Sequence, residues 1–199
     1  MEQTTQVDDV VTALEAQIRE CFGRVAYSTK THEKCADLSM ARLQWIKIAQ
    51  IMLSALTTGG LLTALLGDPK IAYGATVTSA MISTILLVLS AYTKDVDPGQ
   101  QAEKHKKTAC ELLDVRESYL SILSDLHDGH LDLPSARERR DELQARLVSI
   151  YATAPRTTAK AYGIASDGLK QREELTFSDE EIDKFLPTAL HRANHFPSQ

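Results

Sequence analysis

Charge is scarce in the middle of this chain. One residue in four is charged overall (25%), but between Lys47 and Lys94 the only charged residues are Asp68 and Lys70. A helix on the surface of a soluble protein carries charges on its solvent side, so a long interval nearly free of charge is typical of segments that lie in lipid. The sparse charge therefore predicts membrane-spanning structure in the middle of the sequence.

Cysteine is also rare, and no secretory signal opens the sequence. The three cysteines, Cys21, Cys35 and Cys110, are too few and too scattered for a disulfide framework. We interpret them as small buried hydrophobic residues in a reducing compartment. The first residues are polar and acidic, without the basic start of a signal peptide, so we expect no cleaved leader. The net charge of -5 argues against nucleic acid as a partner.

The motifs that usually carry catalysis are missing as well. The sequence has no glycine-rich phosphate loop, zinc-protease motif, CxxC pair or nucleophile elbow, so we expect neither an enzyme nor a cofactor. His32 and Cys35 have metal-like spacing but no second ligand pair, and we prefer a structural role for them. We interpret the aspartates and histidines between Asp125 and Asp132 as a polar turn rather than a metal site.

What the middle does contain is two apolar stretches, residues 48–67 and 71–93, joined by a short turn. Each has about 20 residues, the length at which a helix crosses the hydrocarbon core of a bilayer. Gly67 can end a helix and Pro69 cannot continue one, so the chain reverses between them. The pattern predicts a transmembrane hairpin over residues 47–94; the alternative is a soluble hairpin buried in a large core.

Basic residues flank the hairpin on both sides. They are Lys30, Lys34, Arg42 and Lys47 before it, and Lys94, Lys104, Lys106 and Lys107 after it. The turn has only Lys70. Because positive flanks stay in the cytosol, we expect both ends of the chain there and the turn on the other side.

Both apolar stretches carry polar side chains at helical spacing. The first places Gln50, Ser54 and Thr57 on one face, and the second places Thr76, Ser79, Ser83 and Ser90 on one stripe. The plainer interpretation is contact between helices. The functional interpretation is a weakly polar lining of a water-filled path. Two helices per chain cannot enclose a pore, so the second interpretation requires a homo-oligomer.

The flanking segments are amphipathic and predict more helices. We expect them at 7–25, from about Thr31 into the first apolar stretch, at 108–126, from a capping box at Ser135 to Pro155, at 157–171, and from a second capping box at Ser178 to about residue 190. Asp97–Gly99 should interrupt the chain. No segment alternates with a period of two, so the expected fold class is all-α: a transmembrane hairpin with cytosolic helices that form a bundle. We expect three regions, 1–46, 47–94 and 95–199.

A basic patch is the other candidate site. Arg137, Arg139 and Arg140 stand at a predicted helix start, and Arg156 and Lys160 extend the set. Such a group can bind a phosphate ligand, although solvated helix charge is the plainer interpretation.

The chain resembles the SLATT family, the two-transmembrane effectors associated with SMODS nucleotidyltransferases and SLOG sensor domains in bacteria. The resemblance covers most of the chain. It is carried by GRVAYS at 23–28, THEKCAD at 31–37, LSALTTGGLL at 53–62, YTKD at 92–95, APRTTAKAY at 154–162 and ELTFSDEEID at 174–183. None of these is a catalytic motif.

The resemblance implies an effector of bacterial conflict systems in the inner membrane. Such proteins are thought to oligomerise or open on an infection signal, often a cyclic nucleotide from a companion enzyme, and to permeabilise the membrane. This chain has no recognisable SLOG or nucleotide-synthase domain, so a separate sensor or synthase protein is expected. The leading hypothesis is a gated homo-oligomeric pore. The alternative is a non-conducting membrane scaffold or sensor that recruits a cytosolic partner.

Overall fold

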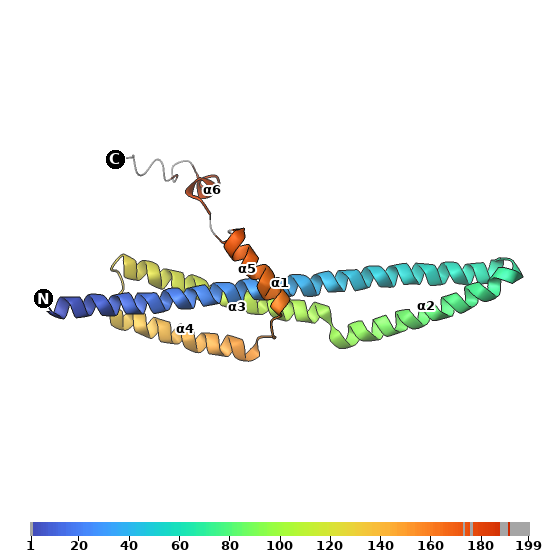
Figure 1. Cartoon of the computed structure of the whole chain (residues 1–199), viewed down its shortest axis with the longest axis horizontal. Coiled ribbons are helices and arrows are strands. Elements are labelled where there is room, and N and C mark those ends of the chain that lie inside the picture. Colours follow the sequence, from blue (N-terminus) through green and yellow to red (C-terminus); the bar gives the residue numbers. More distant parts are fainter. Residues whose placement is uncertain (1, 173, 176, 188–190, 192–199) are drawn as a thin grey trace.

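The computed structural model describes residues 2–172, 174–175, 177–187 and 191, with side chains from Ala13 onward. Its helices are α1 (Glu2–Leu66), α2 (Pro69–Val96), α3 (Pro98–His127), α4 (Leu133–Thr153), α5 (Ala159–Gln171) and α6 (Asp179–Asp183). These ranges contain no strand, which confirms the all-α prediction. The molecule is elongated: α1 runs along its length, pairs with α2 at one end and packs with α3 and α4 at the other (Figure 1).

The first helix is longer than the sequence suggested. We expected one helix at 7–25 and another from about Thr31, but α1 continues without a break through both. The hydroxyl of Thr31 donates backward to the carbonyl of Tyr27 at 2.7 Å, and Thr29 donates in the same way to Val25 at 2.9 Å. A threonine that bonds back along its own helix cannot cap a new one, so the predicted start at Thr31 is wrong.

The reversal between α1 and α2 is as predicted. Gly67 donates its N–H to the Thr63 carbonyl at 2.9 Å, which closes the last turn of α1. Asp68 then caps α2 by accepting a hydrogen bond from the Lys70 N–H at 2.8 Å, and Pro69 takes the first position of the helix.

A second break separates α2 from α3 at Asp97. This residue has φ 37°, in the left-handed region, and serves both helices at once. Its N–H donates to the Thr93 carbonyl at 3.0 Å, and its side chain accepts from the Gln100 N–H at 3.0 Å. The predicted interruption at Asp97–Gly99 is therefore a double cap, which turns the chain from the hairpin into the bundle.

The bundle core lies between the first half of α1 and the antiparallel helix α3, with α4 on one side (Figure 1). Its buried residues are Leu14, Ile18, Cys21 and Val25 from α1, Leu112, Val115, Tyr119 and Ile122 from α3, and Ala136 and Ile150 from α4. Full burial of an aliphatic side chain stabilises by about 1.5–3 kcal/mol, so this set holds the bundle together. Cys21 and Cys35 are buried as expected, but Cys110 is exposed, which corrects the prediction for that residue.

The later helices differ from expectation at their ends. Asp132 caps α4 by accepting from the Ser135 N–H at 3.3 Å, so the helix begins before the capping box predicted at Ser135. The capping box at Ser178 is present, but α6 ends at Asp183, and residues 188–190 of the predicted helix lie outside the described residues. Helix α5 crosses α1 through its small buried residues Ala161 and Ala165 (Figure 1).

Candidate transmembrane hairpin and the polar sites beside it

Helices α1 and α2 meet along a regular seam. Residues with reduced exposure recur at alternating steps of three and four, the pattern of two helices that pack along their length. On α1 they are Leu43, Ile46, Gln50, Leu53, Thr57, Gly60 and Ala64; on α2 they are Ala72, Ala75, Ser79, Ile82, Leu86, Leu89, Thr93 and Val96. The seam uses one face of each helix and leaves the other faces outside the hairpin.

The closest approach of the seam is at Gly60. A Cβ added there would collide with the Ser79 hydroxyl oxygen, so an alanine would force the Ser79 side chain out of its present position. Ser79 is 3% exposed, and its hydroxyl donates to the Thr57 carbonyl at 3.5 Å. A small residue that lets two helix backbones approach, with a hydroxyl that bonds across, is a common device of packing in membranes.

The seven polar residues predicted for the spans lie on one side of the hairpin, which we call the hydroxyl side. Gln50, Thr57 and Ser79 lie in the seam, and Ser54, Thr76, Ser83 and Ser90 follow seam residues directly on its flank. In an antiparallel pair these flanking positions of the two helices share a side. Gln50 Nε2 donates across it to Ser90 Oγ at 3.4 Å. The structure thus brings together two stripes that the sequence shows separately.

The hydroxyls of this side differ in whether they find a partner. Thr57 donates to the Leu53 carbonyl and Thr76 to the Ala72 carbonyl, each at 2.9 Å. Ser54 and Ser83 are exposed, and their hydroxyls form no hydrogen bond with any described residue. A hydroxyl left without a partner in an apolar medium costs about 1–3 kcal/mol. Because the described part of the chain does not use these two hydroxyls, both can bond to water or to another chain beside them.

The outer face of the hairpin has the opposite character. It is covered by large apolar side chains such as Ile51, Met52, Leu87 and Val88, all exposed. The hydroxyls on this face are satisfied internally, as in Thr84, which donates to the Ala80 carbonyl at 3.0 Å. Both helices contain a stretch with the length and composition of a membrane span, and almost none of the residues in these stretches are buried within the chain. The outer face is thus built to contact lipid.

Arg42 links α1 to α2 at the end of the hairpin next to the bundle. Its guanidinium donates to the Tyr92 hydroxyl and lies 5.3 Å from the centre of the Tyr92 ring. Arg42 precedes the first apolar stretch by six residues, or about 9 Å of helix. A tyrosine ring with a cation beside it is typical of the interface between hydrocarbon and water.

The predicted basic patch is divided between the two ends of α4. At the first end, Arg139 pairs with Asp125 at 3.1 Å and Arg140 pairs with Asp141 at 2.7 Å, while Arg137 is exposed. The other two members, Arg156 and Lys160, follow the far end of the helix, about 20 Å away. The five residues therefore do not form one site.

Arg156 and Lys160 instead join Arg42, a residue that the sequence did not connect with them. The three cations line a pocket of about 550 Å³ between α1, the start of α3 and the start of α5. Ser39, Gln101, Thr158 and His105 also line it, and among the described residues no carboxylate does. Only the crossing of α5 over α1 brings these residues together, so nothing in the sequence pattern could have indicated the pocket.

A buried histidine pair lies behind this pocket. His32 of α1 and His105 of α3 are 3–4% exposed, and their Nδ1 atoms are 3.0 Å apart. Burial, and then the neighbouring His105, lowers the pKa of His32 to about 4; burial also lowers the pKa of His105. One neutral ring donates to the other at neutral pH. In the structure His32 thus contacts a second histidine and not Cys35, the residue with which it has metal-like spacing.

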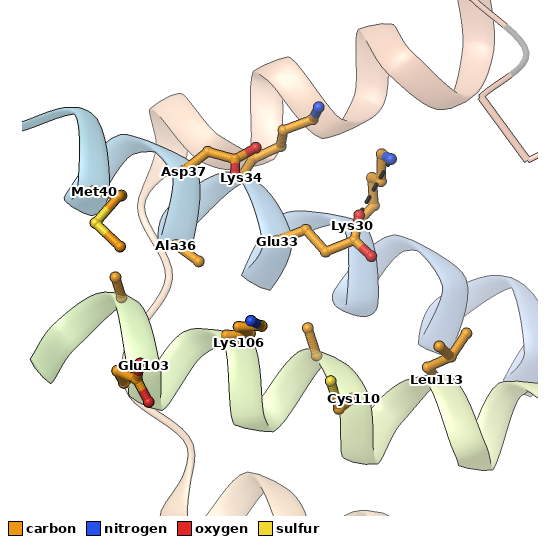
Figure 2. A pocket seen from close by; sticks show the side chains of 12 residues that line it. Lys30, Glu33, Lys34, Ala36, Asp37, Met40, Glu103, Lys106, Cys110 and Leu113 are labelled. Atoms are coloured by element: carbon orange, nitrogen blue, oxygen red, sulfur yellow. Dashed lines mark ion pairs between the residues drawn. The ribbon is translucent and has the colours of Figure 1, made fainter. Parts of the chain in front are cut away.

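A groove of about 530 Å³ lies between α1 and α3 on another face of the bundle. Figure 2 shows Glu33 and Met40 toward the gap from α1, and Lys106 and Cys110 on the α3 wall. The ammonium ends of Lys30 and Lys34 point away from α3 (Figure 2). Both bind Glu174, which follows α5, at 2.8 and 3.6 Å, and so hold the end of α5 against α1.

Two aspartates of the polar segment at 125–132 contact α4. Asp125 pairs with Arg139, and Asp132 caps α4. In the part of the chain that the structure describes, no group of three or more histidine, cysteine, aspartate or glutamate side chains is placed to hold a metal ion.

Comparison with protein families identifies one matching family model. It is that of the SMODS and SLOG-associating 2TM effector domain family 4, and it matches residues 14–181, which include the hairpin and the bundle helices α3 to α5. No curated protein and no solved structure matches the chain significantly. The match agrees with the resemblance that the sequence motifs showed.

Proposed function

Because the chain belongs to the SMODS and SLOG-associating 2TM effector domain family 4 and is a membrane protein of two spans, we propose that it is a pore-forming effector of bacterial antiphage defence. In this proposal, several copies assemble with their hydroxyl sides facing a common axis. Water and ions then pass along the hydroxyl sides, and the host cell is arrested or killed. The protein catalyses no reaction.

The observation that carries the proposal is the position of Ser54 and Ser83. Both are exposed on the hydroxyl side, and neither hydroxyl bonds to a described residue, whereas the threonine hydroxyls on the outer face bond to their own helix. On a side that contacts lipid, the hydroxyls would be expected to form hydrogen bonds within the chain. On a side that contacts water, they can form hydrogen bonds with water instead.

One hairpin presents one hydroxyl side, so a closed path requires a homo-oligomer. The basic flanks favour a bacterial inner membrane location with both ends of the chain in the cytosol. The bundle of α1, α3 and α4 would then be cytosolic, where a signal can reach it. We propose that the signal is a cyclic nucleotide or a separate sensor or synthase protein.

Substitution of Ser83 by leucine tests the lining. Ser83→Leu should suppress the toxicity of overexpression in bacteria while the protein still inserts in the membrane, because a large apolar side chain would close and dewet the path. Thr84→Leu is the matched control: it also exchanges a hydroxyl for leucine, but on the outer face. Equal toxicity of wild type and Ser83→Leu would show that the hydroxyl side only packs helices.

The alternative is a non-conducting scaffold or sensor that recruits a cytosolic partner. Large apolar residues exposed in the later part of the chain, among them Tyr151 of α4 and Phe177 and Phe185 on either side of α6, favour such a contact. Dye release from liposomes separates the two functions. A scaffold leaves the liposomes sealed under every activating condition, whereas the effector releases the dye.

A further inference from the structure

The pocket at the base of the hairpin contains an unusual concentration of positive charge. Arg42, Arg156 and Lys160 line it, and none of the three forms an ion pair with a described residue. In contrast, Arg139 and Arg140 at the other end of α4 are paired with aspartates. The chain as a whole is acidic, with a net charge of -5, so three unpaired cations around one cavity are a local feature and not a consequence of composition.

The neutral groups of the pocket suit an oxyanion. Ser39, Gln101 and Thr158 each offer a hydrogen-bond donor, and Thr158 caps α5, so the positive end of that helix dipole adds to the field. His105 uses Nδ1 toward His32, which leaves its Nε2 for a ligand. A volume of about 550 Å³ is within the range of pockets that hold small ligands.

From these observations we infer that the pocket binds a phosphate-bearing group. Arginine guanidinium and lysine ammonium groups are the side chains that recognise phosphate, and a phosphate offers enough acceptors for all three cations. No carboxylate of the described part of the chain lines the pocket to repel it. The pocket lies about 9 Å along α1 from the first apolar stretch, so the phosphate can come from a lipid headgroup or from a soluble anion.

The location gives the bound group a mechanical role. Arg42 belongs to α1 just before the first span and also binds Tyr92 at the end of the second, while Arg156 precedes α5 and Lys160 lies in its first turn. A phosphate that bridges them ties α5 to the base of the hairpin. Any effect of this phosphate bridge on conduction rests on the proposed function. The binding of the phosphate to the pocket does not rest on it.

The test uses the full-length protein in lipid nanodiscs, without any conductance measurement. One arm titrates inorganic pyrophosphate against protein in phosphatidylcholine discs and records binding by calorimetry. The other arm uses discs with one tenth phosphatidic acid and records by native mass spectrometry how many of these lipids stay with each chain.

The wild type should bind pyrophosphate or retain phosphatidic acid at one site per chain. The double variant Arg156→Gln/Lys160→Gln should bind at least tenfold more weakly, and Arg137→Gln/Arg139→Gln, which removes the same charge at the other end of α4, should bind as wild type does. Pyrophosphate binding assigns the site to a soluble anion, and retention of phosphatidic acid alone assigns it to lipid. Absence of both in the wild type, or equal loss in the two double variants, overturns the inference and leaves the proposed function standing.

Discussion

At the scale of single residues, the histidine pair is the group most sensitive to pH. His32 and His105 are buried side by side, and burial lowers the pKa of both, to about 4 for His32. An unfolded histidine titrates near 6.5. Between pH 6.5 and 4 the unfolded chain therefore binds a proton that the folded chain does not, and stability rises with pH across this window.

We expect the melting temperature of the purified protein in detergent to fall as the pH is lowered from 7 to 5. The loss in the free energy of unfolding should be on the order of 2 kcal/mol. The variant His32→Leu should lose most of this slope, because it removes the group with the large shift. The exposed His130 provides the control, and His130→Gln should keep the slope of the wild type. A slope that is the same in all three proteins would show that the pair is not the cause.

At the scale of elements, the hairpin depends on the contact of Gly60 with Ser79. Gly60→Ala should destabilise the protein by about 1 kcal/mol, because the new Cβ collides with the Ser79 hydroxyl and forces that side chain into another rotamer. Ser79→Ala removes that oxygen, so the double variant should recover most of the loss. Gly59→Ala has open space around its new Cβ and should cost nothing. Unfolding in mixed micelles measures all four, and additive effects of the two substitutions would contradict the contact.

The junction between hairpin and bundle depends on Asp97. Asp97→Val should destabilise by about 2 kcal/mol, because it removes the cap of α3 and places a β-branched residue at φ 37°. Asp97→Asn keeps a side-chain acceptor and tolerates the left-handed backbone, so it should stay within about 0.5 kcal/mol of wild type. Thermal unfolding checks both. Equal losses for valine and asparagine would show that the aspartate charge, and not the double cap, is what matters.

Local patterns predicted most of the elements, and they failed where one residue can act in two ways. The reversal at Gly67 to Pro69 follows from residues that can only end or start a helix. Thr31 is different, because its hydroxyl can cap forward or bond backward, and tertiary packing against α3 selects the continuous helix. The start of α4 is a similar case, because Asp132 and Ser135 can each cap the helix. The structure uses Asp132, which lies before Pro134 and so makes the helix longer.

The candidate site shows the same limit on a larger scale. Helical spacing identified Ser54 and Ser83 on separate stripes, but only the seam of the two helices places both stripes on one side. The histidine pair joins residues 73 positions apart, and the basic pocket joins Arg42 to a segment that reaches it by the crossing of α5. Contacts of this kind depend on how the helices pack against one another. The periodicity of residues within one helix gives no information about that packing.

At the scale of the whole molecule, α1 is one continuous helix that runs from the bundle into the hairpin. Its 65 residues make a rod of about 100 Å. The first half packs against α3, and the second half packs against α2, so a signal that changes the bundle changes the position of the hairpin directly. In the proposed function, the bundle that receives the signal and the hairpin in the membrane therefore share one helix.

The central claim is that the hydroxyl side faces water while the outer face contacts lipid. Single cysteines at positions 83 and 84 test it in a Cys110→Ser background, since Cys21 and Cys35 are buried. Current through planar bilayers is recorded before and after a charged, water-soluble thiol reagent is added. We expect the reagent to change the current of Ser83→Cys and to leave that of Thr84→Cys unchanged. A current from Ser83→Cys that does not respond, or an equal response from Thr84→Cys, would contradict the account.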